Sequence, residues 1–251
     1  MALELNGKTA LITGSTRGIG YAIAAQLMEL GCRVVLNGRD EAALAAALAR
    51  LPGALGFAAD VTMPAQARRL VAEATEALGQ LDIVVCNVGG GRSVAPGGET
   101  PEEWQRVFAL NLWSATNTVE AARASLKASG GAIVCISSIC GLEVIPGAPL
   151  TYAAAKAALH AYVRGIARPL GLDGVRINAI ALGNILFEQS VWERKLAEDR
   201  PGVEGMLARE VALGRLGTPR EAAALAAFLV SERASFATGA IWTLDGGQVH
   251  G

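Results

Sequence analysis

Residues 8–31 read KTALITGSTRGIGYAIAAQLMELG, and this stretch decides the fold class. Its first six residues, KTALIT, form a short apolar run typical of a buried strand. Its last eleven, YAIAAQLMELG (21–31), have the apolar spacing of a helix that ends at a glycine. The glycine-rich turn GSTRGIG joins the two, so the stretch predicts a strand, a tight turn and a helix in that order.

The three glycines of this turn have separate predicted uses. Gly14 permits a tight turn, while Gly18 and Gly20 let a ligand and the helix approach the strand closely. A helix N-terminus offers free N–H groups and positive potential to an anion. The turn therefore predicts a phosphate site for a dinucleotide, with an ordinary strand-to-helix turn as the alternative.

The rest of the chain repeats the alternation of strand and helix. We expect further strands at 33–39, 54–60, 81–91, 131–141, 174–182 and 240–247, and helices at 41–51, 64–79, 100–129, 151 to about 169–171, and 219–231. Thr100 with Glu103, and Thr218 with Glu221, read as capping boxes. The pattern predicts an α/β fold: a single Rossmann-type, doubly wound domain over residues 1–251, with a seven-stranded, mostly parallel sheet and helices on both faces.

Composition and charge exclude several classes of protein. The chain has 251 residues, 52% of them apolar, and a net charge of −1, so no overall field favours nucleic acid or an anionic membrane. We find neither a signal peptide nor an apolar run of about 18–20 residues. Four scattered cysteines and two histidines predict reduced thiols, a cytoplasmic location and no metal site.

Two arginines predict which dinucleotide is bound. After the second strand the chain has Gly38-Arg39, where a protein that prefers NAD often has an acidic residue for the ribose 2′-hydroxyl. A carboxylate repels a 2′-phosphate, whereas a guanidinium grips it through paired hydrogen bonds. Arg17 in the glycine turn adds a second positive charge. Either arginine alone is usually a solvated surface charge, but together they favour NADP(H).

The ends of two further strands supply other cofactor candidates. Ligands of open parallel sheets bind beyond the carboxyl ends of the strands. Asp60 and Val61 follow the third strand, and Asn87, Val88 and Gly89 follow the fourth. Asp60 either accepts a hydrogen bond from an adenine amino group or simply starts the next turn.

Tyr152 and Lys156 are the strongest catalytic candidates. Four residues apart at the start of an alanine-rich helix, they share one face. An ammonium at about 4 Å favours a phenolate by roughly 1–4 kcal/mol. That effect would lower a tyrosine pKa to about 7–9, the range of an acid/base catalyst at neutral pH. A chance pairing is the alternative.

Three polar residues extend this candidate site. Ser137 and Ser138 end the fifth strand, and because strand side chains alternate between faces, only one of them can serve the site. Asn111 lies in the apolar stretch FALNLWSATN. It is either a structural hydrogen-bonding residue or part of a polar relay.

Taken in order, these motifs resemble the short-chain dehydrogenase/reductase family over essentially the whole chain, with the 3-oxoacyl-[acyl-carrier-protein] reductase type as the nearest group. The family's TGxxxGxG resembles Thr13-Gly14-Ser15-Thr16-Arg17-Gly18-Ile19-Gly20, and its Asn-Ala-Gly resembles Asn87-Val88-Gly89. The helix Asn, the strand Ser and the Tyr-x-x-x-Lys match Asn111, Ser138, Tyr152 and Lys156. The C-terminal pattern matches Thr238-Gly239 and Asp245-Gly246-Gly247.

The resemblance implies a function and a role for each residue. It implies hydride transfer between NADP(H) and a carbonyl or secondary alcohol, with Tyr152 as acid/base. Lys156 would lower the tyrosine pKa and hold the nicotinamide ribose, Ser138 would stabilise the substrate oxygen, and Asn111 would anchor a water. The resemblance also assigns cofactor contacts to the turn residues Gly14, Ser15, Arg17, Gly18, Ile19 and Gly20, and to Gly183 and Ile185.

Several features depart from the family pattern. Cys86 replaces an Asn, Leu182 replaces a Pro, Phe187 stands where a Thr often contacts the cofactor, and the spacing from Ser138 to Tyr152 is one residue longer than usual. Residues 184–213 are expected to form a substrate lid. A small-molecule substrate and a homotetramer, or a homodimer, are implied as well. The alternative function is a non-enzymatic NADP-binding regulator or scaffold of the same fold.

Overall fold

The computed structural model describes residues 5–249. Its described strands form one sheet of seven, in the order β3-β2-β1-β4-β5-β6-β7, and every pairing between them is parallel. The strands are β1 (Thr9–Ile12), β2 (Arg33–Gly38), β3 (Leu55–Ala58), β4 (Ile83–Cys86), β5 (Ala132–Ser138), β6 (Arg176–Leu182) and β7 (Ile241–Leu244). The strand order reverses between β1 and β4, as in a doubly wound Rossmann-type sheet, so the predicted fold class is confirmed.

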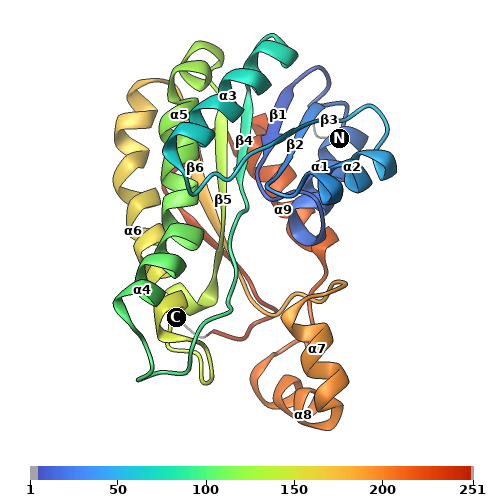
Figure 1. Cartoon of the computed structure of the whole chain (residues 1–251), viewed down its shortest axis with the longest axis vertical. Helices are drawn as coiled ribbons and strands as arrows, with labels where there is room; N and C mark the ends of the chain where they lie inside the picture. Colours follow the sequence, from blue (N-terminus) through green and yellow to red (C-terminus); the bar gives the residue numbers. More distant parts are fainter. Residues whose placement is uncertain (1–4, 250–251) are drawn as a thin grey trace.

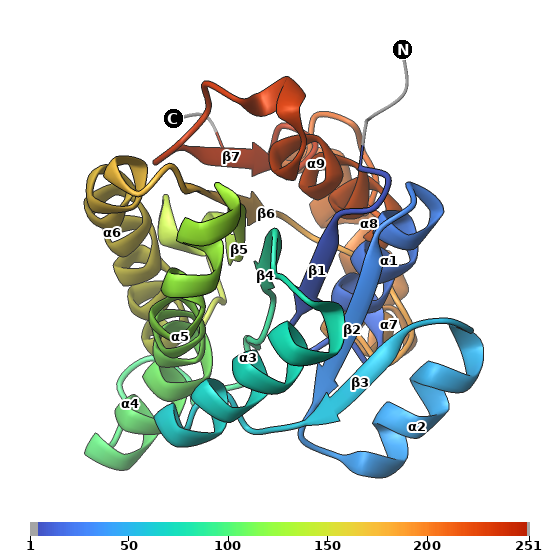
Figure 2. The same cartoon turned by 90° about the horizontal axis from the view of Figure 1, so that it is seen from above.

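Helices cover both faces of the sheet (Figures 1 and 2). One face carries α1 (Gly18–Glu29), α2 (Glu41–Arg50) and α9 (Pro219–Val230), and the other carries α3 (Pro64–Leu78), α5 (Ser114–Ser129) and α6 (Leu150–Leu172). In β5, Val134 and Ile136 face the first layer, while Ile133 and Cys135 face the second. Two apolar cores therefore sandwich the sheet, which explains why its strands are apolar without alternation.

The helix expected over residues 100–129 is divided by a π-helical turn. α4 (Pro101–Phe108) runs into the π-helix Ala109–Trp113, and α5 continues from it. Asn111 lies in the middle of the π-helical turn and is buried. Insertions of this kind are frequent at functional sites, and this one hydrogen-bonds to Gly90 in the loop after β4.

Pro169 does not help to end the helix that carries Tyr152, contrary to the sequence-based expectation. α6 passes through Pro169 and continues to Leu172. The helix ends where Gly174 adopts a φ of +75° and the Val175 N–H bonds to the Leu170 carbonyl at 2.9 Å. The proline removes only its own N–H from the helical pattern, and the stop signal is the glycine.

The two predicted capping boxes differ in outcome. The box of Thr218 and Glu221 at the start of α9 is complete. At α4, Thr100 Oγ1 accepts from the Glu103 N–H at 3.3 Å, but the Glu103 carboxylate is bound to Ser93 and Arg106 instead of reaching back to Thr100. A stronger charged partner has taken the carboxylate, so that box is only half formed.

Residues between β6 and α9 form a separate lobe below the sheet in Figure 1. It contains α7 (Val191–Glu198) and α8 (Arg200–Glu210), with a small apolar cluster of its own made by Val203, Leu207 and Val211. Two 3-10 turns, Ile139–Gly141 and Glu232–Ala234, complete the described elements. Within the described range, no helix combines the length and apolar character needed to span a bilayer.

Candidate active site

The glycine turn is packed tightly between β1, β4 and α1. Gly14 and Gly18 have φ values of +60° and +58°, which L-residues with side chains rarely adopt. A Cβ on Gly14 would lie 2.9 Å from Val88 Cγ2, and one on Gly20 would overlap the Asn87 amide. The glycines are thus required by the turn's own packing as well as by any ligand that approaches it.

Hydrogen bonds made by Asn87 and Ser15 hold the glycine turn in place. Asn87 Nδ2 donates to the carbonyls of Thr13 and Gly14 at 3.2 and 2.8 Å. Ser15 donates its N–H to the Asn37 carbonyl at 2.8 Å and its hydroxyl to the Ile12 carbonyl at 2.7 Å. Both donors of Ser15 are therefore used inside the protein, and the residue joins the turn to β2.

Asn37 is a functional neighbour that the sequence reading missed. Its amide donates to the carbonyls of Phe57 and Ala59, each at 3.1 Å, and its Oδ1 accepts from the Gly14 N–H at 3.4 Å. One buried side chain thereby ties the ends of β2 and β3 to the turn. A polar residue at the end of the apolar run RVVLNGR was the signal that could have revealed it.

The N-terminus of α1 has the features of an anion site. Arg17 is its N-cap residue and provides no side-chain acceptor, so the first N–H groups have no side-chain cap. The Arg17 guanidinium donates to Gln189 Oε1 at 3.1 Å, and the Phe187 ring lies against Gly18. Phe187 and Gln189, which both follow β6 in the chain, therefore contact the glycine turn directly.

The end of β2 lies beside the same turn. The methyl group of Thr16 packs against Gly38. Arg17 follows Thr16 in the chain and Arg39 follows Gly38, so both arginines are next to this contact. Arg39 is exposed and makes no hydrogen bond or ion pair with the residues that the structure describes. Arg50 Nη2 also reaches the turn and donates to the Thr16 carbonyl at 3.1 Å. These guanidinium groups suit a phosphate beyond the end of β2.

Asp60 and Val61 lie past the end of β3. Asp60 Oδ1 accepts from the backbone N–H and the hydroxyl of Thr62 at 3.0 and 2.7 Å. This is the turn-starting role that the sequence left open beside adenine recognition. Val61 is buried, and its carbonyl accepts from Asn117 Nδ2 at 3.1 Å.

Asn111 fastens the end of β4 to the π-helical turn. Its Oδ1 accepts from the Gly90 N–H at 2.9 Å, and its Nδ2 donates to the carbonyls of Gly90 and Val107 at 3.2 and 3.1 Å. A Cβ on Gly89 would lie 2.9 Å from Asn111 Oδ1 and 3.1 Å from Lys156 Nζ. Asn111 thus makes structural hydrogen bonds to the loop after β4, and Gly89, without a side chain, leaves open the space between Asn111 Oδ1 and Lys156 Nζ.

Tyr152, Lys156 and Ser138 meet where α6 passes the end of β5. The ammonium of Lys156 lies 5.8 Å from the centre of the Tyr152 ring and donates to the Ile136 carbonyl at 3.0 Å. The Ser138 hydroxyl is near enough to Tyr152 to influence the pKa of the phenol, and its Oγ accepts from the Cys140 N–H at 3.2 Å. The structure therefore brings together the phenol, the ammonium and the hydroxyl that the sequence singled out.

The structure does not show the expected fall of the Tyr152 pKa. Burial raises the pKa of Tyr152 to about 12, although the neighbouring Ser138 hydroxyl opposes the rise. Burial also lowers the pKa of Lys156 to about 8. Loss of water disfavours the phenolate and the ammonium alike, and the ammonium points at a carbonyl instead of at the phenol oxygen.

Ser137 takes a partner that the sequence did not suggest. Its hydroxyl lies 2.7 Å from Nε2 of His160 on α6, and both residues are buried. Ser138 is left at the open end of the strand with Tyr152. The signal for His160 was its position four residues after Lys156, on the same helix face.

Gly183 and Ile185 follow β6. A Cβ on Gly183 would lie 2.7 Å from the Asp245 Cα, so the chain passes β7 closely there. Ile185 is buried in the core and forms an isolated parallel bridge with Gly217. Its side chain packs inside the protein, which leaves the backbone for any contact with a ligand.

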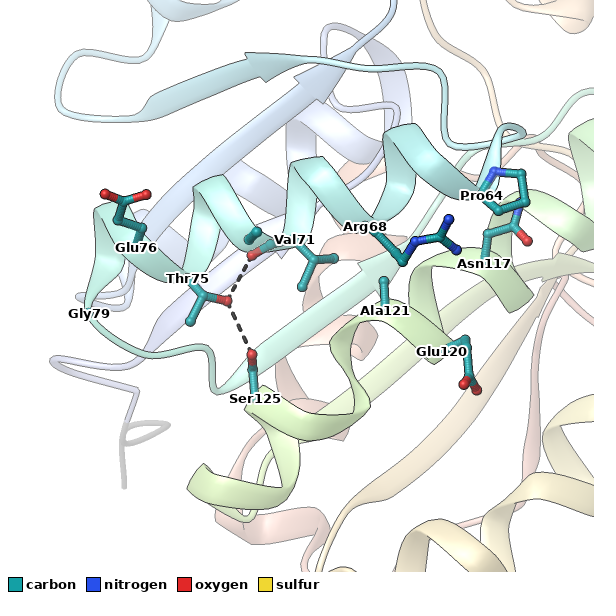
Figure 3. A pocket seen from close by; sticks show the side chains of 11 residues that line it. Pro64, Arg68, Val71, Thr75, Glu76, Gly79, Asn117, Glu120, Ala121 and Ser125 are labelled. Carbon is teal, nitrogen blue, oxygen red and sulfur yellow. Dashed lines mark hydrogen bonds between the residues drawn. The ribbon is translucent and has the colours of Figure 1, made fainter.

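A groove of about 810 Å³ lies away from these residues, between α3 and α5 (Figure 3). Val71 and Ala121 form part of its wall, and Arg68 and Glu120 lie at its rim. Ser125 donates to Thr75 Oγ1 across one end at 3.3 Å, because the Thr75 hydroxyl itself donates to the Val71 carbonyl. None of the predicted site residues lines this groove.

The fold and the site together define a class, the dinucleotide-binding oxidoreductases, and comparison with known proteins gives the family. A family model described as enoyl-(acyl carrier protein) reductase matches residues 14–249. A 3-oxoacyl-[acyl-carrier-protein] reductase FabG of Chlamydia muridarum is 36% identical over 254 residues, which cover 97% of this chain and 98% of that protein. The chain belongs to the short-chain dehydrogenase/reductase family.

Solved structures agree on the fold and differ in their cofactors. The Pseudomonas aeruginosa RhlG/NADP active-site complex superposes with a TM-score of 0.90 at 32% identity, over 98% of this chain and 99% of that one. A 7α-hydroxysteroid dehydrogenase complexed with NADH and 7-oxo glycochenodeoxycholic acid gives 0.88 at 31% identity, over 99% and 96%. The likeness covers essentially the whole fold, and the choice between NADP and NAD depends on this chain's own residues.

Proposed function

We propose that the protein is an NADP-dependent oxidoreductase that interconverts a carbonyl and a secondary alcohol. The observation that carries this proposal is the meeting of Tyr152, Ser138 and Lys156 at the edge of the parallel sheet from which the glycine turn also leaves. A protein that only bound a dinucleotide would have no need for a phenol, a hydroxyl and an ammonium gathered at that place. The chemistry that a bound nicotinamide would supply is hydride transfer.

The roles of the side chains follow from their atoms. The Tyr152 phenol keeps its proton through neutral pH, since burial raises its pKa to about 12, and in reduction it would donate that proton to the substrate oxygen. The Ser138 hydroxyl would hydrogen-bond the same oxygen. The Lys156 ammonium would offset the negative charge left on the phenolate, and Asn111 would hold Gly90 and the loop after β4 in place.

The residues fit NADP(H) as the cofactor. The glycine turn leaves the N–H groups at the start of α1 without a side-chain cap, as a pyrophosphate requires. Asp60 and Val61, Asn87 to Gly89, and the backbone at Gly183 and Ile185 would line its other parts. Arg17 and Arg39 flank the contact between Thr16 and Gly38, where a ribose 2′-phosphate would lie.

Replacing Arg39 by aspartate is expected to shift the preference from NADPH towards NADH. A carboxylate at this exposed position would repel the 2′-phosphate and accept from a 2′-hydroxyl. We expect the ratio of kcat/KM for NADPH to that for NADH to fall about 100-fold, the equivalent of about 2.7 kcal/mol. Arg68→Asp, which makes the same charge change at the groove between α3 and α5, should leave the ratio within about twofold. An unchanged ratio in Arg39→Asp would refute this assignment.

A substrate panel tests the proposed activity itself. Ketones, keto sugars, oxosteroids and 3-oxoacyl thioesters would each be offered with NADPH, and the matching alcohols with NADP, while absorbance at the nicotinamide band is followed. We expect turnover with at least one compound. Tight NADPH binding without turnover of any of them would favour the non-enzymatic binder.

The proposal also includes a lid, the domain organisation, the oligomeric state and the location of the protein. We infer that residues 184–213 form a lid, which is supported by the contacts of Phe187 with Gly18 and of Gln189 with Arg17. A single domain over residues 1–251, a homotetramer or homodimer, and a cytoplasmic location complete the proposal. They are motivated by the sequence alone.

A further inference from the structure

His160 contacts the chain on both sides of Ser138, which is the last residue of β5 and the N-cap of the 3-10 turn that follows. Its Nε2 lies 2.7 Å from Ser137 Oγ, just before Ser138, and its Nδ1 lies 3.2 Å from the carbonyl of Gly141, the last residue of the 3-10 turn Ile139–Gly141. His160 is 2% exposed. One imidazole thus connects the residues that flank the candidate catalytic serine.

The hydrogen-bond directions follow from the partners. The Gly141 oxygen can only accept, so Nδ1 carries the proton. Burial lowers the pKa of His160 to about 4. The hydrogen bond to the Gly141 carbonyl opposes this fall, and the positive charges of Arg164 and Lys156 add to it. The ring is therefore neutral at neutral pH, and Nε2 accepts from the Ser137 hydroxyl.

The turn lies directly on the helix. A Cβ on Gly141 would lie 2.6 Å from the Lys156 carbonyl carbon and 2.8 Å from both the Ala157 nitrogen and His160 Cε1. Tyr152, Lys156 and His160 are spaced by four residues on one face of α6. A contact from His160 to the turn therefore also sets Ser138 in register with Tyr152.

We propose that His160 is a positioning residue for the reaction: its Nδ1–H holds the Gly141 carbonyl and thereby fixes the Ser138 hydroxyl against Tyr152. The two contacts of the ring are unequal. Ser137 is held by β5 itself, since it pairs with Ala181 of β6. Gly141 lies beyond the strand, so the imidazole supplies an anchor that the sheet does not.

Two amide variants separate the contacts. Asparagine places an amide nitrogen near the position of Nδ1, so His160→Asn can still donate to Gly141. Glutamine places its amide oxygen near Nε2, so His160→Gln can accept from Ser137 but loses Gly141. Ser137→Ala removes the other contact without touching the ring, and His160→Leu removes both.

The kinetic test rests on the proposed function and uses whichever substrate the wild-type protein turns over. We expect His160→Leu and His160→Gln to lower kcat about 10- to 100-fold, with the Kd of NADPH within about twofold. His160→Asn and Ser137→Ala should keep kcat within about threefold, although Ser137→Ala lowers the thermal midpoint because Nε2 loses its donor.

Hydrogen exchange at the Cys140 and Leu142 amides, which bond to Ser138 Oγ and the Ile139 carbonyl, provides a readout that needs no activity. Protection should be lost in His160→Gln and kept in His160→Asn. If the wild type proves inactive, the proposed function fails, but hydrogen exchange still tests whether His160 positions the turn. If His160→Leu does not fold, the two amide variants decide it. Equal kcat and equal protection in both amide variants would overturn the proposal.

Discussion

Replacing Tyr152 by phenylalanine is expected to lower kcat about a thousandfold while the Kd of NADPH changes by no more than about twofold. Proton transfer from a positioned side chain contributes roughly 10²–10⁴-fold to a rate. Phenylalanine retains the ring that packs beside Lys156 but loses the hydroxyl that lies near Ser138. The variant therefore removes the proton donor and leaves the cradle for the dinucleotide intact.

Tyr162 offers a matched control on the same helix. It packs partly buried against the core of the α3, α5 and α6 layer, and burial raises its pKa as well. Tyr162→Phe should keep kcat within about twofold, because its phenol lies outside the candidate site. Steady-state rates and NADPH fluorescence titrations on both variants measure the effect. A Tyr152→Phe protein with wild-type turnover would exclude the phenol as the acid/base.

The fold could be predicted from the sequence because the local sequence patterns agree with the strands and helices that the sheet contains. The apolar runs before Gly14 and around Val84 are long enough to mark buried strands, and the glycine turn fixes the first crossover. The π-helical turn at Asn111 gave no such signal. It results from tertiary hydrogen bonds between Asn111 and Gly90, which are 21 residues apart in the sequence.

The site was predicted as a set of residues but not as an electrostatic environment. Spacing alone placed Tyr152 and Lys156 on one helix face. It could not show that burial would dominate the pKa of each group, nor that the Ile136 carbonyl would take the ammonium. The roles of His160 and Asn37 were missed for the same reason: both depend on backbone carbonyls that only the folded chain brings near.

Replacing Lys156 by methionine is expected to stabilise the cofactor-free protein at pH 7 and to lower kcat about a thousandfold. Burial lowers the lysine pKa from 10.5 to about 8. At about 1.4 kcal/mol per pKa unit, keeping the ammonium charged inside the fold costs about 3 kcal/mol. Methionine avoids that cost and forfeits the hydrogen bond to the Ile136 carbonyl, worth about 1 kcal/mol. The net gain in the free energy of unfolding is about 2 kcal/mol, and the catalytic charge beside Tyr152 is lost.

The pH dependence gives this prediction its sign. Between about pH 8 and 10.5 the unfolded chain binds a proton at Lys156 that the folded chain has released, so wild-type stability rises with pH across that window. The advantage of Lys156→Met is therefore full below about pH 8 and falls as the pH rises to 10.5, where the lost hydrogen bond to Ile136 should leave the variant about 1 kcal/mol less stable than the wild type. Urea unfolding at pH 7 and pH 10.5 measures it. Lys127→Met, at a side chain that is 63% exposed and paired with Asp173, should show no gain at pH 7. The prediction fails if the stability difference between the wild type and Lys156→Met does not change with pH. Burial of the Lys156 ammonium would then cost the folded protein no stability.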